Sequence, residues 1–74
     1  MANINQNINF STAARNVIQK AYENSCYTLP ELAKRSKIQY SQLAFYLKGR
    51  NDIRVGDYIS LCIVLNIDIR QLEF

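Results

Sequence analysis

Hydrophobic residues recur along this chain at the spacing of amphipathic helices, in segments separated by short polar stretches. In the first such segment they follow an i, i+3, i+4, i+7 order, which predicts a helix with one core-facing stripe. Ser11 or Thr12 is its expected N-cap, and Asn24 is its expected end. Two shorter helices are expected over about 29–36 and 40–48. The stripe of the first helix consists of Ala14, Val17, Ile18, Ala21 and Tyr22.

The two short helices carry clear boundary signals. Thr28 followed three residues later by Glu31 is a capping box, and Pro30 fits near a helix start. Gly49 is the expected stop of the second short helix, and Ile53 is expected to point inwards from the loop that follows. Two helices joined by three or four residues are typical of a helix-turn-helix, whose second helix can lie in the major groove of DNA.

A fourth helix is expected from about Val55 to Leu65. Its apolar positions span more than one stripe, which places it centrally or at a subunit contact. Asp68 can cap a last short helix, and residues 1–9 are an Asn/Gln-rich flexible arm. The last helix would carry Ile69, Leu72 and Phe74. The expected fold is therefore an all-α compact bundle of about five helices within one domain, residues 10–74.

Composition excludes several classes of protein. No apolar run is long enough to span a bilayer, and the N-terminus lacks the basic and apolar regions of a secretory signal, so a cytoplasmic location is expected. Cys26 and Cys62 are expected to be reduced, partly buried thiols. With no His, two isolated cysteines cannot complete a tetrahedral zinc set, and no metal or cofactor is expected. The chain also has no phosphate-cradling glycine loop and no clustered carboxylate pair, so we expect no enzyme.

The charge is unevenly distributed along the sequence. The formal net charge is +3. Between residues 34 and 54 there are six basic side chains and one acidic side chain, so this segment alone carries +5. The remainder has three basic and five acidic residues and carries −2. A basic segment that coincides with a helix-turn-helix pattern indicates a nucleic-acid surface, whereas a merely solvated charged face is the alternative.

From Leu32 to Leu72 the chain resembles the lambda-repressor-like, Cro/C1-type (XRE) helix-turn-helix family. The resemblance is carried by the LA pair at 32–33, by Ile38, Leu43 and Gly49, and by the ending VLNIDIRQL. It implies an all-α DNA-binding domain. Three positions depart from the family pattern. Lys37 replaces the usual small turn residue, Gln39 replaces a Ser or Thr cap, and Lys48 replaces an acid before the glycine.

The resemblance implies roles for the residues around the third helix. Tyr40, Ser41 and Phe45 match base-reading positions, flanked by Gln39 and Gln42, and Asn51 matches a loop position that contacts DNA in some relatives. Serine and glutamine can hydrogen-bond base edges, and aromatic rings can pack on thymine methyl groups. The expected phosphate contacts are Lys37, Lys48, Arg50 and Arg54. Alternatively, Tyr40, Phe45 and Tyr46 complete the core, or Tyr40 and Phe45 form a protein-binding patch.

These observations favour a small sequence-specific transcriptional regulator of phage, plasmid or bacterial type. It would bind a double-stranded DNA operator as a homodimer, with half-sites about one DNA turn apart. The dimer contact would involve Ile63, Ile67, Ile69 and Phe74, or the N-terminal arm. The alternative is an antirepressor or modulator that binds a partner regulatory protein through the same fold.

Overall fold

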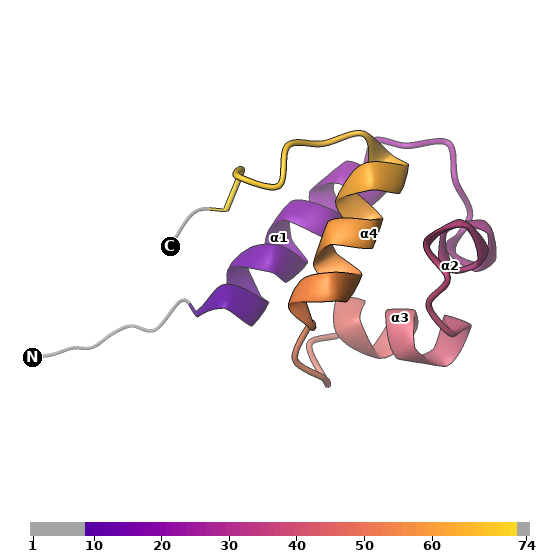
Figure 1. Cartoon of the computed structure of the whole chain (residues 1–74). Helices are drawn as coiled ribbons and strands as arrows, with labels where there is room; N and C mark the ends of the chain where they lie inside the picture. The colour runs from indigo at the N-terminus through magenta and orange to yellow at the C-terminus, as the bar shows by residue number, and fades with distance from the viewer. Residues whose placement is uncertain (1–8, 73–74) are drawn as a thin grey trace, which may run out of the picture.

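Four α-helices form the regular structure of this computed structural model, which describes residues 9–72 (Figure 1). They are α1 (Phe10–Glu23), α2 (Leu29–Ser36), α3 (Tyr40–Leu47) and α4 (Val55–Leu65). No strand occurs in that range, so the expected all-α class is confirmed. α1 and α4 pack side by side, and α3 contacts both α1 and α2.

The first helix begins earlier than the sequence predicted. Asn9 is its N-cap, and the Asn9 side-chain oxygen accepts a hydrogen bond of 2.9 Å from the backbone N–H of Thr12. Ser11 and Thr12 therefore lie inside the helix. Asparagine caps helices as well as serine does. The earlier start also adds Phe10 to the helix, where its ring packs edge-on against the ring of Tyr58 at 5.5 Å between centroids.

The expected short helix after Asp68 does not form within the described residues, which makes four helices rather than about five. Residues 69–70 form a turn instead, because the Asp68 carboxylate accepts hydrogen bonds from the backbone and the guanidinium of Arg70. These hydrogen bonds lower the pKa of Asp68 to about 2. A side chain that bonds to nearby backbone in this way competes with helix formation. Phe74 and most of the predicted arm, residues 1–8, lie outside the described residues.

Three of the four helices are followed by a residue with left-handed backbone: Lys37 (φ 61°), Gly49 (φ 74°) and Asn66 (φ 59°). After α2, the backbone N–H of Ile38 donates to the carbonyl of Ala33 at 3.0 Å, which closes the helix end. Gly49 adopts this geometry without a side chain to obstruct it, as predicted. Lys37 adopts it with a Cβ, at a cost of roughly 1–2 kcal/mol relative to right-handed backbone.

The helix starts differ in how well they are capped. The Thr28 hydroxyl accepts a 3.3 Å hydrogen bond from the backbone N–H of Glu31, so the predicted cap of α2 is confirmed. Gln39, at the start of α3, makes no side-chain cap bond, as expected for a poor capping residue. Since α3 has eight residues and a weak start, its stability must come from tertiary packing.

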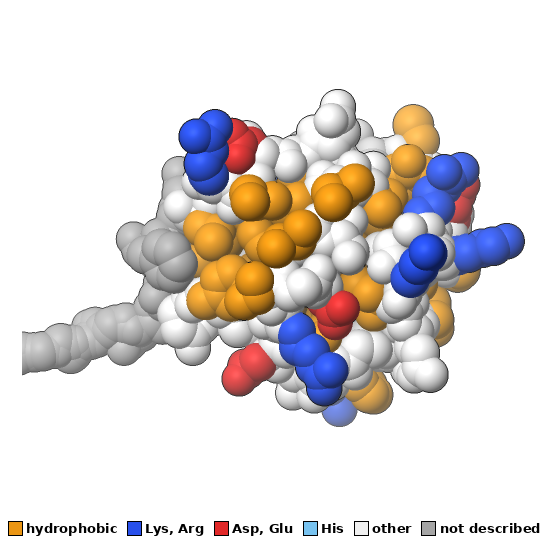
Figure 2. Space-filling view, in the orientation of Figure 1, with side chains coloured by type: hydrophobic (Ala, Val, Ile, Leu, Met, Phe, Trp, Pro, Cys, Tyr) orange, Lys and Arg blue, Asp and Glu red, His pale blue; other side chains and the backbone are white. Residues whose placement is uncertain are grey.

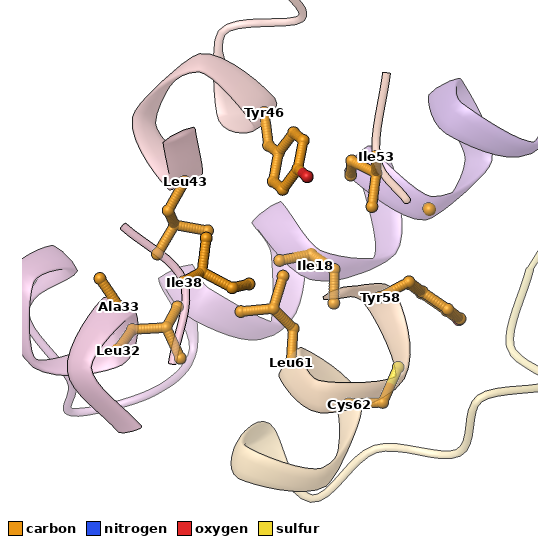
Figure 3. Close-up of a cluster of buried hydrophobic side chains, with 11 residues drawn as sticks. Ile18, Leu32, Ala33, Ile38, Leu43, Tyr46, Ile53, Tyr58, Leu61 and Cys62 are labelled. Carbon is orange, nitrogen blue, oxygen red and sulfur yellow. The ribbon is translucent and has the colours of Figure 1, made fainter. Parts of the chain in front are cut away.

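The core joins side chains from all four helices with two isoleucines from the connections on either side of α3 (Figure 3). Ile38 precedes α3 and Ile53 follows it, and both are buried. The backbone N–H of Ile53 also donates to the Ser11 hydroxyl at 3.0 Å, which ties the loop after α3 to α1. The predicted inward position of Ile53 is therefore confirmed. The other buried members are Ala14, Ile18, Leu32, Ala33, Leu43, Tyr46, Tyr58, Leu61 and Cys62.

Two fully buried tyrosines each have a polar partner for their hydroxyl group. Tyr46 of α3 donates to a carboxylate oxygen of Asp57 in the first turn of α4, at 2.5 Å. Tyr58 donates to the backbone carbonyl of Ile69 at 2.9 Å, which holds the chain after α4 against that helix. These bonds satisfy groups that would otherwise be costly to bury.

Replacing Lys37 with glycine is expected to raise the free energy of unfolding by about 0.5–1 kcal/mol. Glycine removes the strain of the left-handed backbone, and this gain exceeds the extra conformational entropy that glycine loses on folding. Urea denaturation followed by circular dichroism measures this difference. Lys37→Ala is the matched control, since it removes the same charge and keeps the Cβ. Equal stabilisation by both variants would show that charge, and not backbone geometry, limits stability at this position.

Candidate functional site

The outer face of α3 carries exposed aromatic and polar side chains. Tyr40 is 54% exposed and Phe45 is 40% exposed, with exposed Ser41 between them in the sequence. Leu43 and Tyr46 lie on the opposite face and are fully buried. Of the three aromatic residues that could have completed the core, only Tyr46 does so. Tyr40, Ser41 and Phe45, which the resemblance matched to base-reading positions, are therefore exposed.

Three predicted polar residues lie around this face, and the structure brings two of them together. Gln39 is exposed in the turn before α3, and Gln42 is half-buried at the edge of the outer face. Asn51, exposed in the loop after α3, donates a 3.3 Å hydrogen bond from its side-chain nitrogen to the side-chain oxygen of Gln42. The helix and the loop thus present one connected pair of amides. The sequence indicated both residues but not the contact between them.

Tyr46, on the inner face of the same helix, makes a part-buried hydrogen bond to Asp57. Burial raises the pKa of Tyr46, and the hydrogen bond to Asp57 raises it further. The side chain of Gln42 acts in the opposite direction, lowering the pKa of Tyr46. Gln42 and Asp57 both line a shallow surface depression of about 250 Å³, together with Lys37, Ile38, Gln39 and Arg54.

The basic residues predicted to contact phosphate flank α3 at both ends, and all are exposed. They are Lys37, Lys48, Arg50 and Arg54. In the described part of the chain, the two ion pairs join Arg35 to Glu31 and Arg70 to Asp68, so these four cations are left without acidic partners. Unpaired cations around a helix produce a local positive potential that attracts anions.

A fifth basic residue reaches the same end of α3 from a distant part of the sequence. The guanidinium of Arg15, in α1, lies next to Gly49. A Cβ added to Gly49 would be 3.5 Å from the Arg15 Cζ, which is an ordinary van der Waals distance. This position is next to Lys48 and Arg50 in the chain. Sequence reasoning missed Arg15 because its own segment is not basic, and only the packing of α1 against α3 brings it here.

A separate apolar surface lies on α4 and the chain that follows it. Val55, Ile59 and Ile63 recur every four residues along one side of α4 and are exposed, Ile63 by 72%. Ile69 is 46% exposed, and Ile67 is half-buried. Figure 2 shows hydrophobic side chains gathered over the area where Figure 1 places α1, α4 and the chain after α4. Most Lys and Arg side chains visible on this face lie towards α2 and α3.

Other kinds of site receive little support. Between residues 9 and 72 no three His, Cys, Asp or Glu side chains come together as metal ligands, and no helix there is long and apolar enough to cross a membrane. Cys62 is buried and Cys26 exposed, where the sequence had indicated two partly buried thiols. Burial raises the pKa of the Cys62 thiol. Comparisons with protein-family models, curated proteins and solved structures found no match.

Replacing Gly49 with alanine is expected to lower the free energy of unfolding by about 1–2 kcal/mol, because alanine is strained at this positive φ. Gly56→Ala is the matched control. It lies in the first turn of α4, where an added Cβ meets no atom within 4 Å, so this variant is expected to gain up to about 1 kcal/mol. Thermal and urea denaturation measure both. A stable Gly49→Ala variant would contradict the assigned geometry of the loop that holds Arg50 and Asn51.

Proposed function

We propose that this chain is a small sequence-specific DNA-binding regulator of transcription, in which α2 and α3 form a helix-turn-helix. Three residues join these helices, and Figure 1 shows α3 lying across the direction of α2. This is the arrangement that places a second helix in the major groove. The observation that carries the proposal is the exposed outer face of α3, flanked at both ends by cations that have no acidic partner among residues 9–72.

In this proposal the outer face of α3 reads base edges. Ser41, Gln39 and Gln42 supply hydrogen-bonding groups, and the rings of Tyr40 and Phe45 pack on thymine methyl groups. Asn51 approaches the same groove from the loop. Gln39 is the first of these residues in the chain and is exposed at the start of α3, the end that enters the groove in helix-turn-helix proteins.

Phosphate contacts set the position of the domain on DNA and supply most of its salt-dependent affinity. Lys37 and Arg54 lie with Gln42 around the shallow depression, and Lys48 and Arg50 lie at the other end of α3. Arg15 joins the second group. Arg35 is excluded from this set, because it pairs with Glu31 at 3.5 Å and its guanidinium lies 5.3 Å from the centre of the Tyr27 ring.

The regulator acts as a homodimer in the cytoplasm, with two copies on half-sites about one DNA turn apart. The surface that supports this is the exposed apolar side of α4, with half-buried Ile67 and exposed Ile69 in the chain that follows. Within α4 the one charged residue is Asp57, whose carboxylate is engaged with Tyr46 of α3. Two copies can therefore meet along α4 without bringing like charges of this helix together. Phe74, predicted for the same contact, lies outside the described residues.

A second function is supported by the two exposed aromatic residues on α3. Tyr40 and Phe45 present a large apolar area, and α3 contains no Arg or Asn to make the strongest base contacts. Exposed aromatic side chains of this kind are also typical centres of protein interfaces. In this alternative the chain is an antirepressor or modulator whose α3 binds a partner regulatory protein.

Fluorescence anisotropy with duplex DNA from the region upstream of the chain's own gene tests the proposal, with a scrambled duplex beside it. The upstream duplex is expected to bind more tightly. Arg50→Ala should weaken binding to both duplexes roughly tenfold near 0.1 M salt and reduce the salt slope by about one. Arg35→Ala is the matched control and should change neither quantity. Equal affinity of the wild type for both duplexes would contradict a sequence-specific regulator and favour the protein-binding alternative.

Replacing Ile63 with aspartate is expected to shift the protein from dimer to monomer, because each new carboxylate would be buried against an apolar surface. Sedimentation equilibrium over a range of concentrations measures this shift. Cys26→Asp adds the same charge at an exposed position outside the apolar surface and should leave the dimer intact. A wild-type protein that remains monomeric throughout would contradict this interface.

A further inference from the structure

A groove of about 930 Å³ runs along α1, between that helix and the chain after α4. Its residues on α1 recur at three- and four-residue steps from Ala13 to Asn24, so one face of the helix forms one wall. Side chains between Ile67 and Leu72 form the other wall. The stretch of α1 from Ala13 to Asn24 spans roughly 16 Å, or about three helical turns.

The apolar lining of this groove is only partly covered. Ala13 is buried, but Val17, Ala21, Ile67 and Leu72 are half-buried, so part of their apolar surface is open to solvent. Side chains three and four residues apart on one helix face form the ridge against which another helix packs. The small side chains of the two alanines allow a second helix to approach α1 closely. The α1 wall is therefore suited to packing against a helix.

The charged side chains that line the groove have one sign. Lys20 and Arg70 line it, and no carboxylate does so among residues 9–72. Arg70 is paired with Asp68 at 2.9 Å, whereas Lys20 takes part in neither ion pair of the described chain. Exposed Glu23 of α1 lies outside the lining. An acidic partner is thus favoured over a basic one, because complementary charges across an interface mainly determine its specificity.

Helical period separates this groove from the proposed DNA surface. Arg15 lies two residues from both Ala13 and Val17, which places its side chain about 160° away around α1. Because Arg15 approaches Gly49 at the end of α3, the groove opens on the opposite side of α1. In Figure 1 the chain after α4 and α3 likewise lie on opposite sides of α1 and α4. A molecule bound in the groove would leave the outer face of α3 uncovered.

We propose that this groove is the docking site for an acidic amphipathic helix of a partner protein. About three turns of such a helix fit along α1, with apolar side chains on Val17 and Ala21 and an acidic side chain beside Lys20. Helices bind grooves in this way through apolar anchors at positions i, i+3, i+4 and i+7. The groove is a second surface besides the outer face of α3, through which a chain bound to DNA recruits another protein.

A synthetic peptide of about fourteen residues tests this site, with leucine and alanine on one helix face and glutamate beside them. A hydrocarbon staple on its outer face keeps it helical, because short isolated helices are marginal in water. Fluorescence anisotropy should show at least about tenfold tighter binding than for the same peptide with lysine in place of each glutamate. A peptide of equal composition whose leucines are spread around the helix should bind as weakly as the lysine peptide. NMR amide shifts should change at Asn16, Lys20 and Gln71, which line the groove, and not along α3.

Lys20→Glu reverses the unpaired charge of the groove at an exposed position, and circular dichroism checks that the variant is folded. It should weaken binding of the acidic peptide about tenfold, because like charges then meet at the interface. Lys34→Glu is the matched control, since Lys34 is an exposed lysine of α2 outside the groove and within the basic segment 34–54. At about 0.15 M salt it should change the affinity less than about twofold, because distant exposed charges are screened.

Equal affinity for the glutamate and lysine peptides would overturn an acidic partner, and so would the absence of binding up to about 1 mM peptide. Equal losses in Lys20→Glu and Lys34→Glu, or NMR shifts along α3, would place the peptide on the basic surface around α3 and overturn the groove. Binding only after Phe74→Ala would assign the groove to the chain's own end, and a dimer lost in Lys20→Glu would assign it to a second copy. Either result overturns a partner helix. None of these measurements uses DNA, so their outcome is independent of whether the chain is a DNA-binding regulator.

Discussion

The burial of Ile38 and Ile53 is the constraint on which the rest of the structure depends. α3 has eight residues and no side-chain cap at its start, so it is too short and too poorly capped to persist by itself. One buried isoleucine lies in the turn before it and another in the loop after it, and each contributes roughly 1.5–3 kcal/mol by leaving water. The core thus holds α3 from both ends as well as through Leu43 and Tyr46. The outer face of α3 is not needed for packing against the core.

Fixing α3 in this way also sets the electrostatics around it. The connections that carry the buried isoleucines also carry basic residues, so burying one side of each connection exposes its cations on the other. Arg15 adds a further cation from α1. These charges have no acidic partners among residues 9–72, and their mutual repulsion is a cost to the folded state that an anionic ligand would relieve. The arrangement suits a surface that is completed by a polyanion.

The sequence predicted features that depend on local residue chemistry. It missed features that depend on tertiary packing, or on whether a side chain caps a helix or closes a turn. The cap at Thr28 and the helix stop at Gly49 follow from residue type, and the structure confirms them. The predicted last helix does not form within residues 9–72, because the Asp68 side chain closes a turn with Arg70 as readily as it would cap a helix. The positions of Arg15 and of the Gln42–Asn51 contact arise from tertiary structure, and no spacing rule indicates them.

The hydrogen bond between Gln42 and Asn51 also bears on how such a surface can change over generations. Tyr40, Ser41 and Phe45 are exposed, so their side chains can be exchanged one at a time while the fold persists. Gln42 and Asn51 are partners across the end of α3, so a change in one removes the partner of the other unless both change together. The outer face of α3 therefore combines positions free to drift with one position that is coupled to the loop after the helix.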